Sequence, residues 1–279
     1  MARFDRLKTG RQNWETHWQE VADYMQPRKA DVTKTRSKGD KRTEQIFDSS
    51  PIQAVELLAA SLHGMLTNPS TPWFSLRYKD EGLDADDEAK LWLEGVTETM
   101  YTAFNRSNFQ QEIFELYHDL ITFGTAAMFI EEDQSDLLKF STRHINEIYI
   151  TENDKGRIDT VYRRFKITLR AAAQQFGTNL SEEAKTKVEK DPFDEIDILH
   201  AVYPRIEFDP TKKNKENMEF ESVYLEYKNG NELSVGGFVE FPFVVPRYLK
   251  ASHEIYGRSP AMTALPDVKM LNEMSKTTI

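Results

Sequence analysis

The chain has 279 residues, of which 39% are hydrophobic and 29% are charged, so it can form one large domain or two ordinary ones. Its net charge of −10 disfavours tight, general binding to nucleic acid, although an acidic protein suits a path along which DNA slides without sticking. The lack of cysteine excludes disulfides, thiol catalysis and thiolate metal sites. Because the sequence has neither a signal-peptide core nor an apolar run of membrane-spanning length, we expect a protein of the cytosol or of something assembled there.

Helical periodicity begins near the start of the chain and ends at Pro27, because the residue before a proline avoids helical backbone angles. Two tryptophans on adjacent turns are typical of packing in a core or an interface. Arg11 interrupts the apolar stripe. The stripe consists of Phe4, Leu7, Trp14, Trp18, Val21 and Met25.

A basic segment follows at residues 28–42, with seven basic and two acidic side chains and no aromatic one. This composition predicts a solvated, mobile loop over residues 28–45. The alternative is a contact with phosphates or with an acidic partner, since base stacking needs aromatic side chains. The candidate contact residues are Lys34, Arg36, Lys38, Lys41 and Arg42.

A second helix is predicted from Ser50, which stands as the cap before Pro51 at the first helical position and Gln53 three residues after the cap. Two prolines and polar residues break it at residues 68–72. Residues 73–78 then alternate between apolar and polar side chains, which predicts a short strand.

Two more helices are predicted before Gly124. An acidic stretch at residues 80–88 opens the first, through about Asn105, because carboxylates complement the dipole at a helix start. The stretch does not match a calcium-binding loop, which needs alternating Asp or Asn positions and a central glycine. Asn108 is predicted to cap the second of these helices.

After Gly124 the period changes to two, which predicts strands. Asn229 and Gly230 form the preferred two-residue turn of a hairpin. Helices first and mostly antiparallel strands second give an α+β fold. The predicted strands cover residues 126–131, 137–141, 147–150, 159–167, 196–203, 222–228 and 232–235, and short helices cover residues 168–176 and 181–190.

A last helix is predicted from Pro266, which suits a first helical turn, with Asp267 placing a negative charge near the helix start. No glycine, asparagine or proline ends this helix before Ile279. We therefore expect the chain to be a fragment cut within a longer protein.

Catalytic, cofactor and metal motifs are missing from the sequence. Gly236 and Gly237 lack the Gly-Lys-Ser/Thr ending of a phosphate-binding loop, and Pro260 stands where a nucleophile elbow requires a small residue. We expect no cofactor, no metal and no enzymatic activity. A hydrolytic enzyme stays open only because carboxylates are abundant. The six histidines, none in a His-Glu-x-x-His pair or a metal cluster, are His17, His63, His118, His144, His200 and His253.

Several blocks of the sequence, in this order, resemble the portal (head-to-tail connector) proteins of short-tailed bacteriophages, the podovirus type, over their N-terminal part. The blocks are spread over nearly the whole chain, which is more specific than any one of them. They are residues 7–27 with the paired tryptophans, Ile46-Phe-Asp-Ser-Ser-Pro51, Leu57-Leu-Ala-Ala-Ser-Leu-His-Gly-Met-Leu66, Pro72-Trp-Phe-Ser-Leu76, residues 120–133, Pro246-Arg247, Tyr256-Gly-Arg-Ser-Pro260 and residues 264–272.

The resemblance implies a structural, non-enzymatic subunit of a homo-oligomeric ring, commonly a dodecamer, at one vertex of the capsid. DNA is packaged and ejected through such a ring without sequence-specific binding. The implied partners are terminase, tail or adaptor proteins, capsid and scaffolding protein, with no membrane. The implied location is the virion, after assembly in the host cytoplasm.

The resemblance also implies an organisation. Residues 1–125 would be the helical part of the portal wing with the mobile basic loop 28–45, residues 126–250 its β-rich part, and residues 251–279 a linker and the start of a stem helix. The rest of the stem would follow Ile279. We expect residues 1–279 alone to be monomeric or loosely oligomeric, because much of the stem packing is missing. The alternative function is a DNA- or terminase-binding module acting through residues 28–42.

Overall fold

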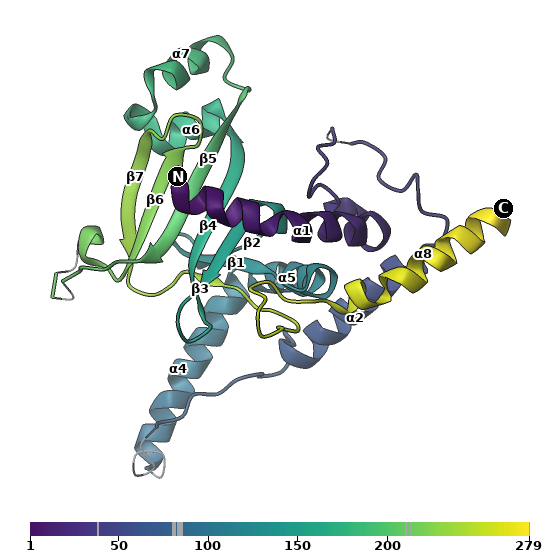
Figure 1. Cartoon of the computed structure of the whole chain (residues 1–279). Helices are drawn as coiled ribbons and strands as arrows, with labels where there is room; N and C mark the ends of the chain where they lie inside the picture. Colours follow the sequence, from purple (N-terminus) through teal and green to yellow (C-terminus); the bar gives the residue numbers. More distant parts are fainter. Residues whose placement is uncertain (38, 80–81, 83–85, 210, 213, 279) are drawn as a thin grey trace. The chain divides into compact units, whose positions relative to one another are not determined.

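The computed structural model describes residues 1–37, 39–79, 82, 86–209, 211–212 and 214–278, and has the predicted α+β fold with helices first (Figure 1). The chain divides into two compact units. Unit 1 comprises Met1–Thr16 and Ile145–Phe243, and unit 2 comprises His17–His144 and Val244–Ile279. The division at residues 125 and 250 remains a prediction.

Unit 1 is built on a five-stranded antiparallel sheet in the order β3-β4-β5-β6-β7. The five strands predicted for this unit are present, with ends shifted by at most three residues. The strands are β3 (Ile148–Glu152), β4 (Ile158–Thr168), β5 (Glu195–Pro204), β6 (Phe220–Glu226) and β7 (Glu232–Phe238).

Both faces of this sheet bury apolar side chains, because neighbouring residues of a strand point to opposite faces. On β5, Ile198 packs in the cluster formed with the short helices α6 (Leu169–Phe176) and α7 (Glu182–Lys190). The next residue, Leu199, packs on the other side with Phe4 of helix α1 (Ala2–Met25). Phe4 also meets Tyr149 edge to face at 4.7 Å. The alternating pattern of the strands thus fixes a two-sided core.

Arg11, the residue that interrupts the apolar stripe of α1, is buried and ties this helix to the turn η2 (Ile145–Glu147). Its guanidinium donates to the carbonyls of Ile145 at 2.9 Å and of Asn146 at 2.8 Å. It also lies over the ring of Tyr149 at 3.6 Å and pairs with Glu15 at 2.7 Å. The charge is therefore buried with partners, as a buried guanidinium requires.

The hairpin of β6 and β7 is present, but its loop is longer than the two residues predicted. The Glu226 amide donates to the Asn231 carbonyl at 2.8 Å, which leaves Asn229 and Gly230 inside a wider turn. The Glu226 carboxylate accepts from the side chains of Asn229 at 2.8 Å and Asn231 at 3.2 Å. These side-chain bonds hold the wider loop in place of a tight backbone turn.

Unit 2 combines helices with a small sheet and contains the second half of α1. Strands β1 and β2 pair in antiparallel fashion, and β8 extends the sheet in the order β2-β1-β8. Apart from α1, the elements are η1 (Pro27–Lys29), α2 (Ser50–Leu66), α4 (Asp87–Arg106), α5 (Phe109–Phe123), β1 (Ala127–Asp133), β2 (Leu137–Arg143), β8 (Phe243–Val244) and α8 (Pro260–Thr278).

The predicted strand at residues 73–78 is wrong. This segment pairs with no strand among the described residues and is held by side chains of α4 instead. The Tyr101 hydroxyl accepts from the amides of Trp73 at 2.6 Å and Phe74 at 2.7 Å, and it donates to the Phe74 carbonyl at 2.9 Å. Trp73 and Phe74 pack among aromatic rings, such as Phe109 stacked on Trp73.

Two predicted helix caps work differently in the structure. Ser49 stands at the N-cap of α2, one residue before the predicted Ser50, and the Asp48 carboxylate accepts from the Ser50 amide at 2.7 Å. Asn108 is at the N-cap of α5 but makes no capping bond. Its side chain accepts from the Phe140 amide at 2.9 Å and donates to the Phe140 carbonyl at 2.8 Å. The Asn108 side chain, which the sequence pattern predicted to cap the helix, therefore binds the backbone of a strand residue far away in the sequence.

The start of α4 is acidic, as predicted. Asp86 is its N-cap and accepts from the Glu88 amide at 3.4 Å. Asp80, Glu81 and Asp84 of the predicted acidic stretch lie outside the described residues.

The last helix begins at Pro260 and not at the predicted Pro266, which lies inside it. Proline is tolerated at a first helical position, where no amide donor is needed. The Ser259 hydroxyl accepts from the Met262 amide at 2.9 Å and so acts as the cap. Sequence periodicity missed this start because Ser259 also donates to the carbonyl of Thr122, a residue far away in the sequence, at 2.9 Å.

Two glycines allow the end of α5 to contact the segment before α8. Gly124 ends α5 in the left-handed region with φ 75°, as predicted. A Cβ atom on Gly257 would lie 2.3 Å from the Gly124 carbonyl oxygen, and one on Gly124 would lie 2.3 Å from that of Gly257. The Gly257 amide donates to the Thr125 hydroxyl at 2.8 Å. Only glycine fits this approach of two backbones.

We predict that Gly257→Ala lowers the stability of unit 2 by about 3 kcal/mol, because the new methyl group overlaps a backbone oxygen that cannot move freely. Gly64→Ala is the matched control. Gly64 lies in α2 with no atom near its Cβ position, so alanine should be neutral or stabilising there. Chemical denaturation followed by circular dichroism measures both. Equal stabilities for the two variants would contradict the assigned close contact.

Candidate nucleic-acid and partner interfaces

The basic segment, residues 28–42, is held along α1 by Gln19, a buried polar residue of that helix. The Gln19 side-chain oxygen accepts from the amides of Val32 at 3.0 Å, Thr33 at 2.8 Å and Lys34 at 3.2 Å. Its amide group donates to the Ala30 carbonyl at 2.7 Å. One side chain thus binds backbone groups of four residues in an irregular segment, Ala30, Val32, Thr33 and Lys34.

Three of the predicted contact residues lie in ion pairs within unit 2. Lys34 and Arg36 both reach Asp23 of α1, at 2.6 and 3.1 Å. Arg42 pairs with Asp31 at 2.5 Å. Asp23 and Asp31 therefore neutralise basic side chains that would contact only solvent in the predicted solvated loop.

The other two predicted contact residues differ. Lys41 is exposed, and no ion pair of its side chain is found among the described residues. Lys38 lies outside the described residues. The structure brings Lys41 to a hollow of about 110 Å³, whose lining residues are Asp23, Arg36, Lys41, Arg42, Glu44 and Gln45.

Two basic residues at the start of the segment are bound to α5. Arg28 pairs with Glu115 at 2.9 Å, and Lys29 pairs with Asp119 at 2.6 Å. Burial acts to raise the pKa of Glu115, but hydrogen bonding from Arg28 and the charge of Lys29 outweigh it and hold that pKa below its usual value. Most basic side chains of the segment therefore have a carboxylate partner within unit 2.

Sequence reasoning missed Gln19 and Asp23 as the residues that organise the basic segment. Their four-residue spacing puts both on one face of α1, and Gln19 donates to Asp23 at 2.9 Å. That spacing was the available signal, but it does not reveal which distant segment a polar helix face will bind.

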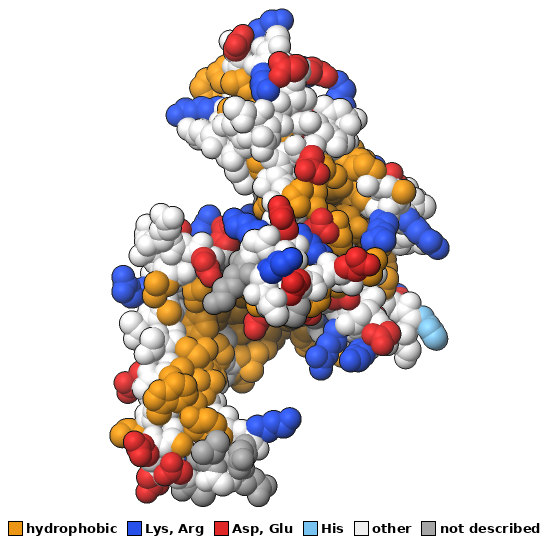
Figure 2. All heavy atoms as spheres, turned by 90° about the vertical axis from the view of Figure 1, so that its left-hand side faces the viewer, with side chains coloured by type: hydrophobic (Ala, Val, Ile, Leu, Met, Phe, Trp, Pro, Cys, Tyr) orange, Lys and Arg blue, Asp and Glu red, His pale blue; other side chains and the backbone are white. Residues whose placement is uncertain are grey.

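An uncovered apolar surface runs along α4, a helix without any buried residue. Trp92 is 62% exposed and Leu91 is 69% exposed. They border a shallow hollow of about 360 Å³ with Val96 and Met100. Figure 2 shows hydrophobic side chains gathered on the lower part of this view, where α4 lies. An apolar strip of this kind on a polar protein is typical of a surface that meets another molecule.

Two other helices of unit 2 also leave large apolar side chains exposed. On α2 these are Leu57 and Met65. On α8 they are Met270 and Met274, one helical turn apart. Methionine surfaces adapt to varied partners because the side chain is unbranched and polarizable. The helices of unit 2 therefore present several apolar faces at once.

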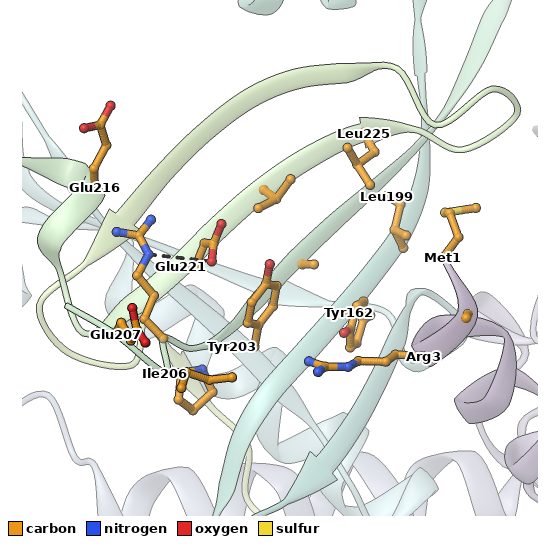
Figure 3. Close-up of a pocket in the computed structure, with 15 residues that line it drawn as sticks. Met1, Arg3, Tyr162, Leu199, Tyr203, Ile206, Glu207, Glu216, Glu221 and Leu225 are labelled. Carbon is orange, nitrogen blue, oxygen red and sulfur yellow. Dashed lines mark ion pairs between the residues drawn. The ribbon is translucent and has the colours of Figure 1, made fainter.

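Unit 1 contains an open groove of about 730 Å³ between the start of α1 and strands β5 and β6 (Figure 3). Tyr162 and Tyr203 lie in its floor, and Arg205 pairs with Glu221 at 3.6 Å on its rim. Arg205 also donates to the Gly236 carbonyl at 2.9 Å. The Arg205 guanidinium is therefore held by Glu221 and by the backbone of β7.

Among the described residues, no three His, Asp or Glu side chains are placed to hold a metal ion. The histidines make separate bonds, such as His63 to Gln110 at 2.8 Å and His200 to Ser222 at 3.0 Å.

Within the described part of the chain, none of the helices has both the length and the apolar character needed to cross a membrane.

Comparison with known proteins gives one consistent result. The family model described as bacteriophage head to tail connecting protein matches residues 1–279. The chain is 32% identical over 276 residues to the probable portal protein of Bordetella phage BPP-1, covering 97% of this chain and 50% of that protein. The portal protein of Salmonella phage epsilon15 matches with the same identity and coverage. The chain thus spans about half the length of these curated relatives.

We predict that His118 makes unit 2 less stable in acid. Burial, then the charge of Arg28, lower the pKa of this histidine below its ordinary value of 6.5, while Glu115, Asp119 and Glu56 act in the opposite direction. Below pH 6.5 the unfolded chain therefore binds a proton that the folded chain does not, so stability falls as the pH falls toward the lowered pKa. His118→Gln should show a shallower fall in denaturation experiments between about pH 7 and 5. Parallel curves for both proteins would exclude this role.

Proposed function

The chain belongs to the bacteriophage head to tail connecting protein family, and from this premise we propose that it acts as a portal subunit in a ring of identical copies at one capsid vertex. DNA would enter the head through this ring during packaging and leave through it at infection. The observation that carries the proposal is the match of the family model along residues 1–279, together with two portal relatives that align with 97% of the chain.

Several partners follow from this proposal. The ring, a dodecamer in its full form, would bind terminase during packaging and tail or adaptor proteins afterwards, with capsid and scaffolding protein around it. The subunit would assemble in the host cytoplasm and remain in the virion. Its work would be structural and without catalysis.

The uncovered apolar faces of unit 2 support contacts between copies. A closed ring uses a head-to-tail contact, in which one surface of a subunit meets a different surface of the next. The exposed side chains of α4, which include Trp92, suit such a contact because tryptophan contributes strongly at interfaces.

The net charge supports passage of DNA without capture. A charge of −10 on each copy repels phosphates on average and limits sticking. The ion pairs of Lys34, Arg36 and Arg42 act in the same direction, because they neutralise the most basic stretch of the chain.

The second candidate function is a DNA- or terminase-binding module that acts through residues 28–42. The observation in its favour is the exposed Lys41 beside the half-exposed Lys34. In this arrangement, phosphates or carboxylates of a partner would compete with Asp23 and Asp31 for the same cations.

The two functions differ in a measurable way. If the second holds, replacing Lys34, Arg36, Lys38, Lys41 and Arg42 by Gln should weaken DNA binding and reduce the slope of log affinity against log salt by up to about four units. Replacing exposed lysines elsewhere, Lys155 and Lys190, is the control. An unchanged affinity and slope would leave the ring function as the sole proposal.

For the ring function, we predict that the pair Leu91→Ser and Trp92→Ser in the full-length protein reduces ring formation while the subunit still folds, since α4 contains no buried residue. Phe193→Ser is the matched control, because it removes an equally exposed aromatic side chain from unit 1. Light scattering and electron microscopy measure the assembly, and circular dichroism measures the fold. If the α4 variant forms rings in full yield, the α4 face is excluded as a contact between copies. If the unmodified full-length protein stays monomeric in the presence of scaffolding protein, the proposed ring itself is contradicted.

A further inference from the structure

The second half of α8, residues 267–278, binds the irregular segment that joins the basic segment to α2. Its central contact is Asn272, a polar side chain that is only 4% exposed. The Asn272 side-chain oxygen accepts from the amides of Phe47 at 2.7 Å and Asp48 at 3.3 Å. Its amide group donates to the Gln45 carbonyl at 3.0 Å. One buried side chain thus satisfies three backbone groups of a segment that forms neither helix nor strand.

Two further residues of α8 contact the same segment from the same face of the helix. Lys276 lies over the ring of Phe47, 5.8 Å from its centre. Hydrogen bonds from Ser50, and a weaker one from Ser275 of α8, lower the pKa of the Asp48 carboxyl below its ordinary value. Because residues three and four apart share one face of a helix, these contacts and that of Asn272 form one continuous surface.

The same face of α8 also reaches α1. Lys269, one turn before Asn272, forms an ion pair with Glu20, and its ammonium group lies 5.9 Å from the centre of the Tyr24 ring. Glu20 directly follows Gln19, which binds the first part of the basic segment. Within unit 2, α1 therefore holds the start of the basic segment, and α8 holds the residues that follow its end.

Different forces hold the two halves of α8. In the first half, Ala261, Met262 and Leu265 are buried among apolar side chains, whereas the second half is held by the polar contacts just described. Pro266 lies between the two halves. A proline inside a helix has no amide hydrogen, so the carbonyl four residues earlier loses its usual partner and the helix is weakened at that point. The second half can therefore move away from its contacts while the buried first half stays in place.

We propose that the second half of α8 is a clasp on residues 45–48, and that opening the clasp frees the end of the basic segment. With the clasp closed, this end is anchored on both sides, by the ion pair of Arg42 and by the bond of Asn272 to Gln45. Opening removes the second anchor and gives the backbone between them more conformational freedom. Lys41 and Arg42 then become more accessible to another molecule. The clasp acts within one subunit, so it does not depend on whether the subunit joins a ring.

Limited proteolysis of the full-length protein tests the clasp, because trypsin cleaves after Lys41 and Arg42 at a rate set by how often the backbone there is open. Asn272→Leu keeps the size of the side chain and removes its three bonds, so cleavage at these two sites should be about tenfold faster. Asn13→Leu, the same substitution at an exposed position of α1, is the matched control. Cleavage after the exposed Lys155 of unit 1 is the internal control and should not change.

A second variant leaves every buried side chain in place, so the test stands even if Asn272→Leu fails to fold. Lys269→Glu puts two carboxylates opposite each other where an ion pair now joins α8 to α1. Cleavage after Lys41 and Arg42 should then be about threefold faster, the scale of an exposed ion pair. Reversing both charges, with Glu20→Lys added, should restore the original rate.

Coupling between two parts of a protein acts in both directions. Cutting the unmodified protein after Lys41 or Arg42 should therefore speed amide hydrogen exchange in residues 270–276 by about threefold and leave residues 261–265 unchanged. For a folded variant, an unchanged cleavage rate, or a rise that also occurs after Lys155, would overturn the proposal. Unchanged exchange in residues 270–276 of the cut protein would overturn it as well.

Discussion

The contact of the Gly124 and Gly257 backbones is the constraint on which the arrangement of unit 2 depends. It joins the end of α5 to the segment before α8, and the Tyr248 amide donates to the Gly124 carbonyl at 2.9 Å. Ser259 continues the junction by bonding Thr122 while it caps α8. The direction of α8 relative to α5 within unit 2 is therefore set by backbone geometry, which tolerates little variation.

Single polar side chains hold the irregular segments of both units. Arg11 binds carbonyls of the turn before β3, Gln19 binds the basic segment, and Asn108 binds β2. Asn272 of α8 accepts from the Phe47 amide at 2.7 Å and donates to the Gln45 carbonyl at 3.0 Å. Each of these side chains satisfies backbone groups that regular structure would otherwise pair. Substitution of one of these side chains therefore frees a whole backbone segment and does more than remove a single contact.

Helices and strands with strong periodicity were predictable because their own side chains carry the pattern, as in β5 and α5. The errors occurred where a distant residue decides the local structure. Tyr101 replaces a strand partner for Trp73 and Phe74, and Thr122 positions the cap that starts α8 at Pro260. The candidate contact residues could be predicted from their positive charge. Their partner Asp23 could not, since a single sequence does not show which carboxylate forms an ion pair with a given lysine.

The convergence of three consecutive backbone amides on the Gln19 oxygen has a further consequence. Successive amides that point to one spot form a concavity which in many proteins captures a phosphate oxygen. Here a neutral oxygen of the same chain already fills it. A phosphate that reaches residues 32–34 therefore finds these three amides already bonded, and only their side chains remain to meet it.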